Sequence, residues 1–484
     1  MLAPLVEIVH SQSMDEWLTR NQTAFEGLFG SRYPKAARDL YKLRAPKDTQ
    51  IPYAAYIHPS NPDSGAYAGL CFVMFPISDG PCLFGLGIGT QGLSPDEAIL
   101  GRPGHARKAM AICDWLAAAF GDGSRVTWAR RDPTQLDVSL PSDLTVEWPE
   151  YQQVFDRYGK APGSVLYALY RPTADRAATE RALAAFLDLL FAEKNVEPMA
   201  AHKKQALADR AAWSSLILPD LQQGTVADLL RQRRFVILQG PPGTGKTRMA
   251  EELLKKVYLG RGRTIQFHPN TTYENFIGGL APVSTADALG LRFAPQPGVL
   301  MRAAAEAAET DEPYLLHIDE INRADLGKIL GEAIYLLEPG APERTVDLPL
   351  DFGQPHGTKL RLPPNLHILG TMNSSDRSIA ILDVAVRRRF AFAPLWPQIA
   401  VVQQHGGEVM REAFQRLLDI FVDHAPEDAF ALLPGHSYFL ELDDALAKPR
   451  LRVTLAPLLE EYLAQGYVSG FAEQIRSYLQ WLRL

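Results

Sequence analysis

The chain has few cysteines, no long apolar run and no strong excess of charge of either sign. Its 484 residues include three cysteines, Cys71, Cys82 and Cys113, an odd number without the spacing of a metal site. They predict neither a disulfide framework nor a zinc site. Cysteines of this kind are typical of a reducing cytoplasm, and we expect them as small core residues.

No window approaches 18 uninterrupted apolar residues, so the sequence predicts no membrane-spanning helix. The N-terminus lacks a basic segment followed by an apolar run, and we expect no signal peptide. The net charge of −7 argues against a polybasic nucleic-acid binder, so any DNA contact must come from local patches or an oligomer's pore. We therefore expect a cytoplasmic protein of roughly two to four domains.

The most specific pattern is a glycine-rich segment after the apolar run 235–238. It reads Gly240, Pro241, Pro242, Gly243, Thr244, Gly245, Lys246 and Thr247. A strand, a glycine-rich turn and a helix in this order predict a phosphate-binding loop, because the turn points backbone N–H groups at phosphate oxygens and the helix adds its positive end. In this interpretation Lys246 reaches the β- and γ-phosphates and Thr247 binds Mg²⁺.

A second pattern lies about 70 residues further on, where the apolar strand 314–318 ends in Asp319 and Glu320. Acids at the carboxyl end of a parallel strand face the nucleotide crevice. We expect Asp319 to hold Mg²⁺ through water and Glu320 to act as the general base on the attacking water. The plainer alternative is a buried strand followed by an acidic helix cap, and His317 is expected as a core histidine.

A third strand, 365–372, ends at Asn373, and a basic segment follows at 387–389. In an additional-strand P-loop ATPase, a polar residue at this strand end lies between the P-loop and the acids and orients the attacking water. The segment predicts an arginine finger that enters a neighbour's site, with Arg388 and Arg389 preferred over Arg387. The alternative is a solvated basic helix end.

Several runs together resemble AAA+ proteins of the McrB family, the NTPase subunits of modification-dependent restriction systems. The runs that carry the resemblance are 266–269 with 273–277, 318–324, 370–378, 383–390 and 435–439. They occur in the right order over about 215–465, roughly half of the chain. This combination is far more specific than a P-loop alone.

The resemblance implies an α/β fold, an AAA+ P-loop NTPase core with β-hairpin insertions and a C-terminal helical lid. It also implies a homo-oligomer, a hexameric ring, that hydrolyses ATP or GTP with Mg²⁺ between subunits. A partner, an McrC-like nuclease subunit, is expected to couple through Asn373 and Asp376. We find no Asp…Glu-x-Lys nuclease pattern in this chain, which agrees with a separate nuclease.

Two other classes remain open. A MoxR or dynein-related remodelling ATPase acting on proteins shares the core and its hairpins, although the Met-Asn-x-x-Asp-Arg-Ser run favours the McrB type. A small-molecule P-loop kinase should lack the Asn373 strand and the arginine segment. The P-loop pattern does not distinguish ATP from GTP, because its contacts go to the phosphates and not to the base.

The predicted domains are an α+β domain at 1–170, a helical connector at 171–214, the AAA+ core at 215–394 and the lid at 395–484. The first should contain a hairpin between 66–75 and 82–89 and a helix at 106–120. Before this hairpin, the same domain contains basic residues interleaved with Tyr33 and Tyr41, namely Arg32, Lys35, Arg38, Lys42, Arg44 and Lys47.

Basic and aromatic groups together suit nucleic acid, and the spacing of Lys35, Arg38 and Lys42 predicts a shared helix face. Residues 1–170 nevertheless carry 15 basic and 18 acidic residues, so the domain is not basic overall. DNA or modified-base recognition, a protein-interaction or sensing module and a structural extension all remain open for it.

Overall fold

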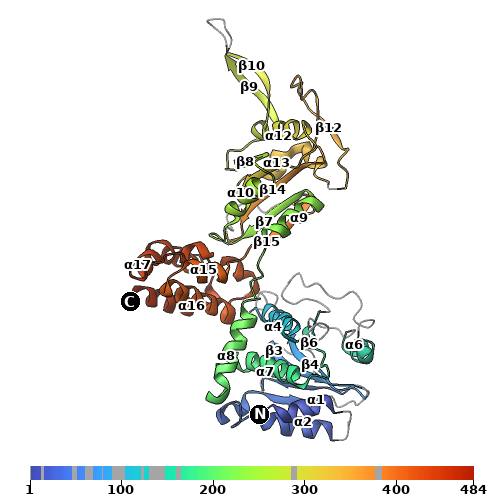
Figure 1. The fold of residues 1–484 in the computed structure, drawn as a ribbon, viewed down its shortest axis with the longest axis vertical. Coiled ribbons are helices and arrows are strands. Elements are labelled where there is room, and N and C mark those ends of the chain that lie inside the picture. Colours follow the sequence, from blue (N-terminus) through green and yellow to red (C-terminus); the bar gives the residue numbers. More distant parts are fainter. Residues whose placement is uncertain are drawn as a thin grey trace. The chain divides into compact units, whose positions relative to one another are not determined.

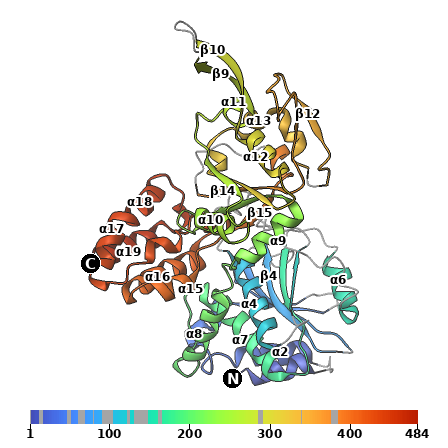
Figure 2. The same ribbon diagram turned by 45° about the horizontal axis from the view of Figure 1, so that its top comes forward.

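The protein, a computed structural model, forms two compact units (Figures 1 and 2). The first comprises 1–219, 415–430 and 456–484, and the second 220–414 and 431–455. The four-domain division expected from the sequence stays a prediction. The structure describes residues 2–11, 16–45, 52–59, 69–78, 80–89, 104–120, 125–129, 148–159, 165–284, 291–338, 340–375 and 384–484.

The first unit contains an antiparallel sheet with the strand order β1-β2-β3-β4-β6-β5. Its strands are β1 (Lys42–Arg44), β2 (Ala54–Ile57), β3 (Gly69–Phe75), β4 (Leu83–Gly89), β5 (Arg125–Ala129) and β6 (Val165–Tyr170). β3 and β4 pair from Gly69 opposite Gly89 to Phe75 opposite Leu83, which confirms the predicted hairpin. Because side chains alternate along a strand, β3 contributes to apolar cores on both faces of the sheet.

Helices bury both faces of this sheet. Phe186 of α7 (Arg176–Ala192) packs against Phe84 of β4, and α6 (Gln152–Gly159) adds Val154 and Phe155 to the opposite face. The sequence predicts α7 as a connector, yet it is buried along most of its length within this unit. The predicted helix 106–120 is present as α4 (His105–Phe120). All three cysteines are buried, as expected for small core residues.

The other helices of this unit are α1 (Ala3–His10), α2 (Trp17–Glu26), α8 (Ala200–Ser214), α18 (Ala456–Ala464) and α19 (Ala472–Arg483). Helix α16 (Glu408–His424) begins in the second unit and continues into the first. Within the described ranges, none of the helices is both long and apolar enough to cross a membrane.

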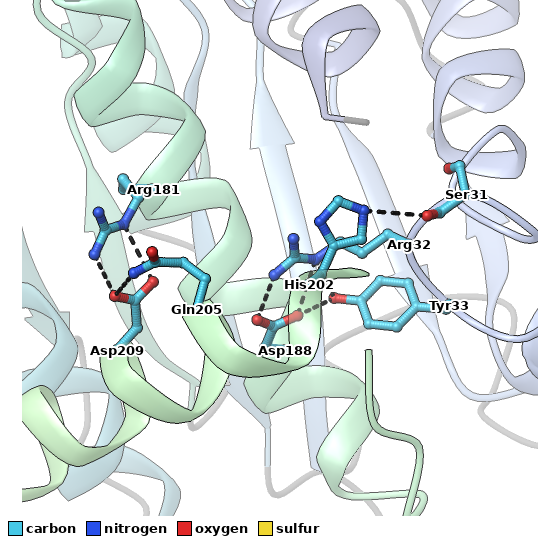
Figure 3. Close-up of polar contacts among 8 residues, drawn as sticks. All are labelled: Ser31, Arg32, Tyr33, Arg181, Asp188, His202, Gln205 and Asp209. Carbon is cyan, nitrogen blue, oxygen red and sulfur yellow. Dashed lines mark hydrogen bonds and ion pairs between the residues drawn. The ribbon is translucent and has the colours of Figure 1, made fainter. Parts of the chain in front are cut away.

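The basic and aromatic residues near position 35 do not form the predicted helix face, because Lys42 lies in β1 and only Lys35–Leu40 is helical, as a 3-10 turn. Arg32 and Tyr33 are buried and both bind the carboxylate of Asp188 on α7, with Tyr33 Oη donating to Oδ1 at 2.6 Å (Figure 3). Tyr41 is also buried, and its hydroxyl donates to a backbone carbonyl.

A neighbouring set of contacts joins α7 to α8. Arg181 of α7 pairs with Asp209 of α8, and Gln205 donates to the same carboxylate at 2.9 Å (Figure 3). His202 Nε2 lies 3.2 Å from the carbonyl oxygen of Ser31, which accepts its hydrogen bond. These polar groups hold the helices in place, so they are not available to stack on or pair with nucleic acid. Lys47 lies outside the described residues.

The second unit is built on a parallel sheet with the strand order β15-β7-β14-β11-β8. The strands are β7 (Phe235–Gly240), β8 (Gly262–Gln266), β11 (Tyr314–Asp319), β14 (Leu366–Asn373) and β15 (Ala391–Pro394). The inner strands β7, β14 and β11 are largely apolar because helices cover both faces, whereas the edge strand β8 is mostly polar. One core joins the sheet to α9 (Gln223–Arg233) and α10 (Lys246–Lys256), and the other to α12 (Val299–Ala308) and α13 (Leu326–Leu330).

Two antiparallel hairpins interrupt this α/β core, as the fold class predicts. The first, β9 (Gly278–Ser284) and β10 (Leu291–Pro297), is a ribbon that extends away from the parallel sheet (Figures 1 and 2). The second is formed by β12 (Thr345–Asp347) and β13 (Lys359–Arg361). The unit also contains the short helix α11 (Tyr273–Phe276), the helices α15 (Ile399–His405) and α17 (Asp444–Thr454), and the 3-10 turn His436–Phe439.

Candidate nucleotide-binding site

The glycine-rich loop joins β7 to α10. Gly243 and Gly245 have φ angles of +80° and +82°, in the left-handed region that favours glycine, and Gly245 is the N-cap residue of α10. The loop therefore turns the chain sharply into the helix and leaves the first N–H groups of α10 without helical partners. Such a turn is typical of an anion-binding site at a helix N-terminus.

Lys246, the first residue of α10, is 7% exposed. Its Nζ donates to the carbonyl oxygens of Gly240 at 3.0 Å and Pro241 at 2.7 Å. Burial lowers the pKa of Lys246 to about 8, against the opposing influence of Glu320 and Asp319. The ammonium group is thus held within the loop, beside the two acids.

The carboxylate of Asp319 links helix α10 to strand β14. Its Oδ1 accepts from the hydroxyl of Thr247 at 3.0 Å and also from the hydroxyl of Thr371 on β14. The second acid, Glu320, has a φ of +53°, a left-handed conformation that costs a non-glycine residue about 1–3 kcal/mol. The backbone N–H of Glu320 donates to Thr371 Oγ1 at 3.3 Å.

The side chain of Glu320 is fixed by two neighbours. Asn373 Nδ2 donates to Glu320 Oε1 at 2.7 Å, and Arg323 Nε lies 3.4 Å from Oε2. Asn373 ends β14, the strand between β7 and β11. The structure therefore brings Lys246 and Thr247, both acids and Asn373 to one edge of the sheet.

These residues line a cavity of about 930 Å³. Its walls are formed by Gln223, Pro242, Gly243, Thr244, Gly245, Lys246, Thr247, Arg248, Met249, Glu252, Asp319, Glu320, Thr371, Asn373, Leu395, Gln398, Val401, His405, His436, Ser437, Leu440 and Leu442. No cluster of three metal-ligating side chains occurs among the described residues. One carboxylate beside one hydroxyl nevertheless fits Mg²⁺, which takes few protein ligands when phosphates and water supply the rest.

His317 is buried within β11, as expected for a core histidine. Its Nδ1 lies 3.3 Å from Thr264 Oγ1, and its Nε2 lies 4.0 Å from Asp319 Oδ1. Burial lowers the pKa of His317 to about 4, so the ring is neutral.

The arginine segment lies at the end of α14 (Val384–Arg387). Arg387 and Arg388 are exposed, whereas Arg389 is 8% exposed. The guanidinium of Arg387 stacks on Phe392 at 5.3 Å. Among these three side chains, Arg388 is the one that is both exposed and not stacked on that ring. Asp376 lies outside the described residues.

Two contributors to the cavity were not assigned to it from the sequence: Thr371, and a segment within the lid motif 435–439. Thr371 precedes Asn373 by two residues on β14, so both side chains lie on the same face of the strand. This spacing is the sequence feature that could have identified Thr371. The second is the segment Gly435–Tyr438, here called the lid segment. Gly435 N–H donates to the Pro242 carbonyl at 2.9 Å, and Ser437 N–H donates to the Gly243 carbonyl at 3.0 Å.

Comparisons with known proteins agree with this geometry. Residues 235–390 match the model of the AAA domain, dynein-related subfamily. The "Type IV methyl-directed restriction enzyme EcoKMcrB subunit" of Escherichia coli K12 is 31% identical over 293 residues, 55% of this chain and 61% of the relative. The "Type II restriction enzyme BsuMI component YdiS" of Bacillus subtilis 168 is 28% identical over 193 residues, 32% of this chain and 55% of the relative.

The solved structure of NtrX from Brucella abortus matches 63% of this chain and 75% of its own length at 11% identity, with a TM-score of 0.25. The matched domain and the parallel sheet define an AAA+ P-loop NTPase domain. Within that class the chain is similar to the McrB subunit over 55% of its own length, which confirms the resemblance carried by the motifs. It spans 61% of the length of the Escherichia coli relative.

The lid segment contacts the P-loop so closely that there is no space for a side chain at Gly435. A Cβ there would lie 2.0 Å from the Gly243 carbonyl carbon and 2.4 Å from the Thr244 nitrogen. We expect Gly435→Ala to lower the free energy of unfolding by about 1–3 kcal/mol, because the backbones must separate. Nucleotide affinity should fall with it.

Urea denaturation and titration with a fluorescent nucleotide measure both quantities. Gly224→Ala is the matched control, since no atom lies within 4 Å of its added methyl group. A Gly435→Ala protein as stable as the control would show that the two backbones separate freely.

Proposed function

We propose that the second unit binds and hydrolyses ATP or GTP, with residues 240–247 holding the triphosphate. The observation that supports this most is the convergence of Lys246, Thr247, Asp319, Glu320 and Asn373 on one cavity. Thr247 and Asp319 would hold Mg²⁺. When bound, the ion neutralises charge on the β- and γ-phosphate oxygens.

The residues of this chain then have separate tasks. Lys246 places a positive charge beside the phosphates. Glu320 takes the proton of the attacking water, and Asn373 keeps the Glu320 carboxylate oriented through the bond at 2.7 Å. Thr371 holds both Asp319 and the backbone of Glu320, so the two acids keep a fixed separation.

Two substitutions should separate binding from chemistry. Lys246→Ala removes the charge that faces the phosphates, so nucleotide binding should be lost or severely weakened. Glu320→Gln retains size and hydrogen bonding but removes the base, so binding should persist while the steady-state rate falls about 10²- to 10⁴-fold. Phosphate release and nucleotide titration measure the two effects.

The controls are Lys255→Ala and Glu309→Gln, both at exposed positions of the same unit. Tight nucleotide binding by Lys246→Ala would argue against its role. An unimpaired rate in Glu320→Gln would remove Glu320 from the mechanism.

We further propose that the protein forms a homo-oligomeric ring, a hexamer, in which Arg388 or Arg389 enters the site of the neighbouring subunit. The exposure of Arg388 supports this position for the finger, and Arg389 is a weaker candidate because it is buried. A cation inserted at the γ-phosphate spreads the charge of the transition state. It also explains why the γ-phosphate would favour assembly.

Mixing two inactive variants tests the shared site. An Arg388→Ala/Arg389→Ala protein has an intact P-loop, and Lys246→Ala has intact arginines, so mixed rings should regain some active interfaces. NTPase activity above both parents is the expected result, with light scattering to establish mixed assembly. In the control mixture, Arg233→Ala, at an exposed position on α9, takes the place of the double variant and is mixed with Lys246→Ala. Mixed rings without any gain would refute the assignment in trans.

The relatives are named as subunits or components of restriction enzymes. We therefore propose that this chain is the motor of an anti-phage DNA restriction system and that a McrC-like partner supplies the nuclease. The partner would act through Asn373 and Asp376. Because Asn373 touches Glu320, a small shift of this loop moves the base, and misplacement of about 1 Å can cost roughly a hundredfold in rate.

The purified chain should hydrolyse nucleotide slowly and cut no DNA, and the partner should raise its turnover. Asp376→Ala should leave the basal rate nearly unchanged and remove the stimulation. Rates with and without partner, and a metal-dependent DNA cleavage assay, measure these effects. Cleavage by the chain alone, with contaminating nuclease excluded, would overturn the division of labour. Undiminished stimulation of Asp376→Ala would reject only the coupling route.

We also propose that the first unit recognises DNA, which is supported by the names of the relatives and not by Arg32, Tyr33 or Tyr41, which are buried. The alternative function is a dynein-related ATPase that remodels proteins, since the matched domain model carries that name. A neighbouring gene for a nuclease would favour restriction, and one for a metal-binding or von Willebrand-type partner would favour remodelling.

A further inference from the structure

The lid segment places one imidazole beside the phosphate-binding turn. Its backbone bonds to Pro242 and Gly243 hold the segment directly on the loop. His436 lies between these two anchored residues, Gly435 and Ser437, so its backbone position is fixed relative to the P-loop. Its side chain lines the nucleotide cavity.

Hydrogen bonding assigns the tautomer of His436. The backbone N–H of Gln398 lies 3.2 Å from His436 Nδ1, and a backbone N–H can only donate. Nδ1 is therefore the acceptor, and in the neutral ring the proton is on Nε2. Burial lowers the pKa of His436 to about 4, with Arg248 acting in the same direction, so the neutral form dominates near pH 7.

The Nε2 edge of this ring faces the turn. Nε2 lies 3.7 Å, and Cε1 4.0 Å, from the point that a Cβ on Gly245 would occupy. Gly245 directly precedes Lys246, whose ammonium group is directed at the phosphates in the proposed function. The donor of His436 therefore lies on the phosphate side of the cavity, where Gly245 leaves room for an oxygen to approach.

We propose that His436 is a phosphate-binding residue of the lid, whose Nε2–H donates to a phosphate oxygen of the bound nucleoside triphosphate. This inference rests on the proposed nucleotide site and adds a binding residue to it. As a neutral donor, His436 adds a directed hydrogen bond without a further positive charge beside Lys246. Because phosphates are common to ATP and GTP, its contribution is independent of the base.

Conservative substitutions separate the donor from the anchor. His436→Asn keeps an acceptor at the Nδ1 position for the Gln398 N–H but loses the donor. His436→Gln places an amide donor near the Nε2 position but loses the acceptor, and His436→Leu lacks both. The measurement is affinity for non-hydrolysable ATP and GTP analogues, with thermal unfolding to establish that each variant folds.

We expect His436→Asn and His436→Leu to bind both analogues roughly 10- to 100-fold more weakly, the usual range for a hydrogen bond to a charged group. His436→Gln should remain within about threefold of the unmodified protein. Wild-type affinity in His436→Asn, or a loss in His436→Gln as large as in His436→Asn, would overturn the proposal. So would a loss confined to one base, which would place the ring at the base.

Failure of the inference and failure of the proposed function are distinguishable. If the unmodified protein binds neither analogue, the nucleotide site itself is refuted. If it binds them and His436→Asn binds equally well, only the role of His436 is refuted.

Discussion

The arrangement of the nucleotide cavity depends on one constraint, the parallel pairing of β14 with both β7 and β11. Asn373 lies level with Gly240, and Gly370 lies level with Ile318, so Thr371 comes beside Asp319. Neighbouring strands are about 4.8 Å apart, which a hydroxyl and a carboxylate can span. A slip of one residue would turn these side chains to the other face and break the network.

Two groups at the same edge of the sheet are in states that cost free energy. Lys246 is charged and 7% exposed, and Glu320 adopts a left-handed backbone conformation. Each is held by specific partners: two carbonyl oxygens for the ammonium group, and Thr371 and Asn373 for the acid. The apolar cores on both faces of the sheet supply the rigidity that holds such groups before any ligand binds.

Local chemistry made much of this site predictable. The turn 240–247 and the acids 319–320 each follow a short apolar run, and a parallel sheet brings the ends of such runs to one edge. The contact of Thr371 with Asp319 was not predictable, because it depends on register between strands about 50 residues apart. Register follows from the packing of the whole sheet, which no single segment encodes.

The basic residues of the first unit show the opposite outcome. A cation next to a tyrosine can bind nucleic acid, and it can equally well bind a buried carboxylate far along the chain. Arg32 and Tyr33 meet Asp188, which is more than 150 residues away, and both become interior groups. Interleaved charge and aromatic rings therefore predict a polar partner but not its identity, whereas the P-loop carries its turn geometry within its own glycines.

The lid segment extends this reasoning to long-range contacts between backbones. A Cβ on Gly435 would collide with the backbone of Gly243 and Thr244, and hydrogen bonds to Pro242 and Gly243 close the contact. Two backbones in direct contact transmit displacement with little slack, since no flexible side chain separates them. Any movement of the loop at 242–243 must therefore displace the lid segment.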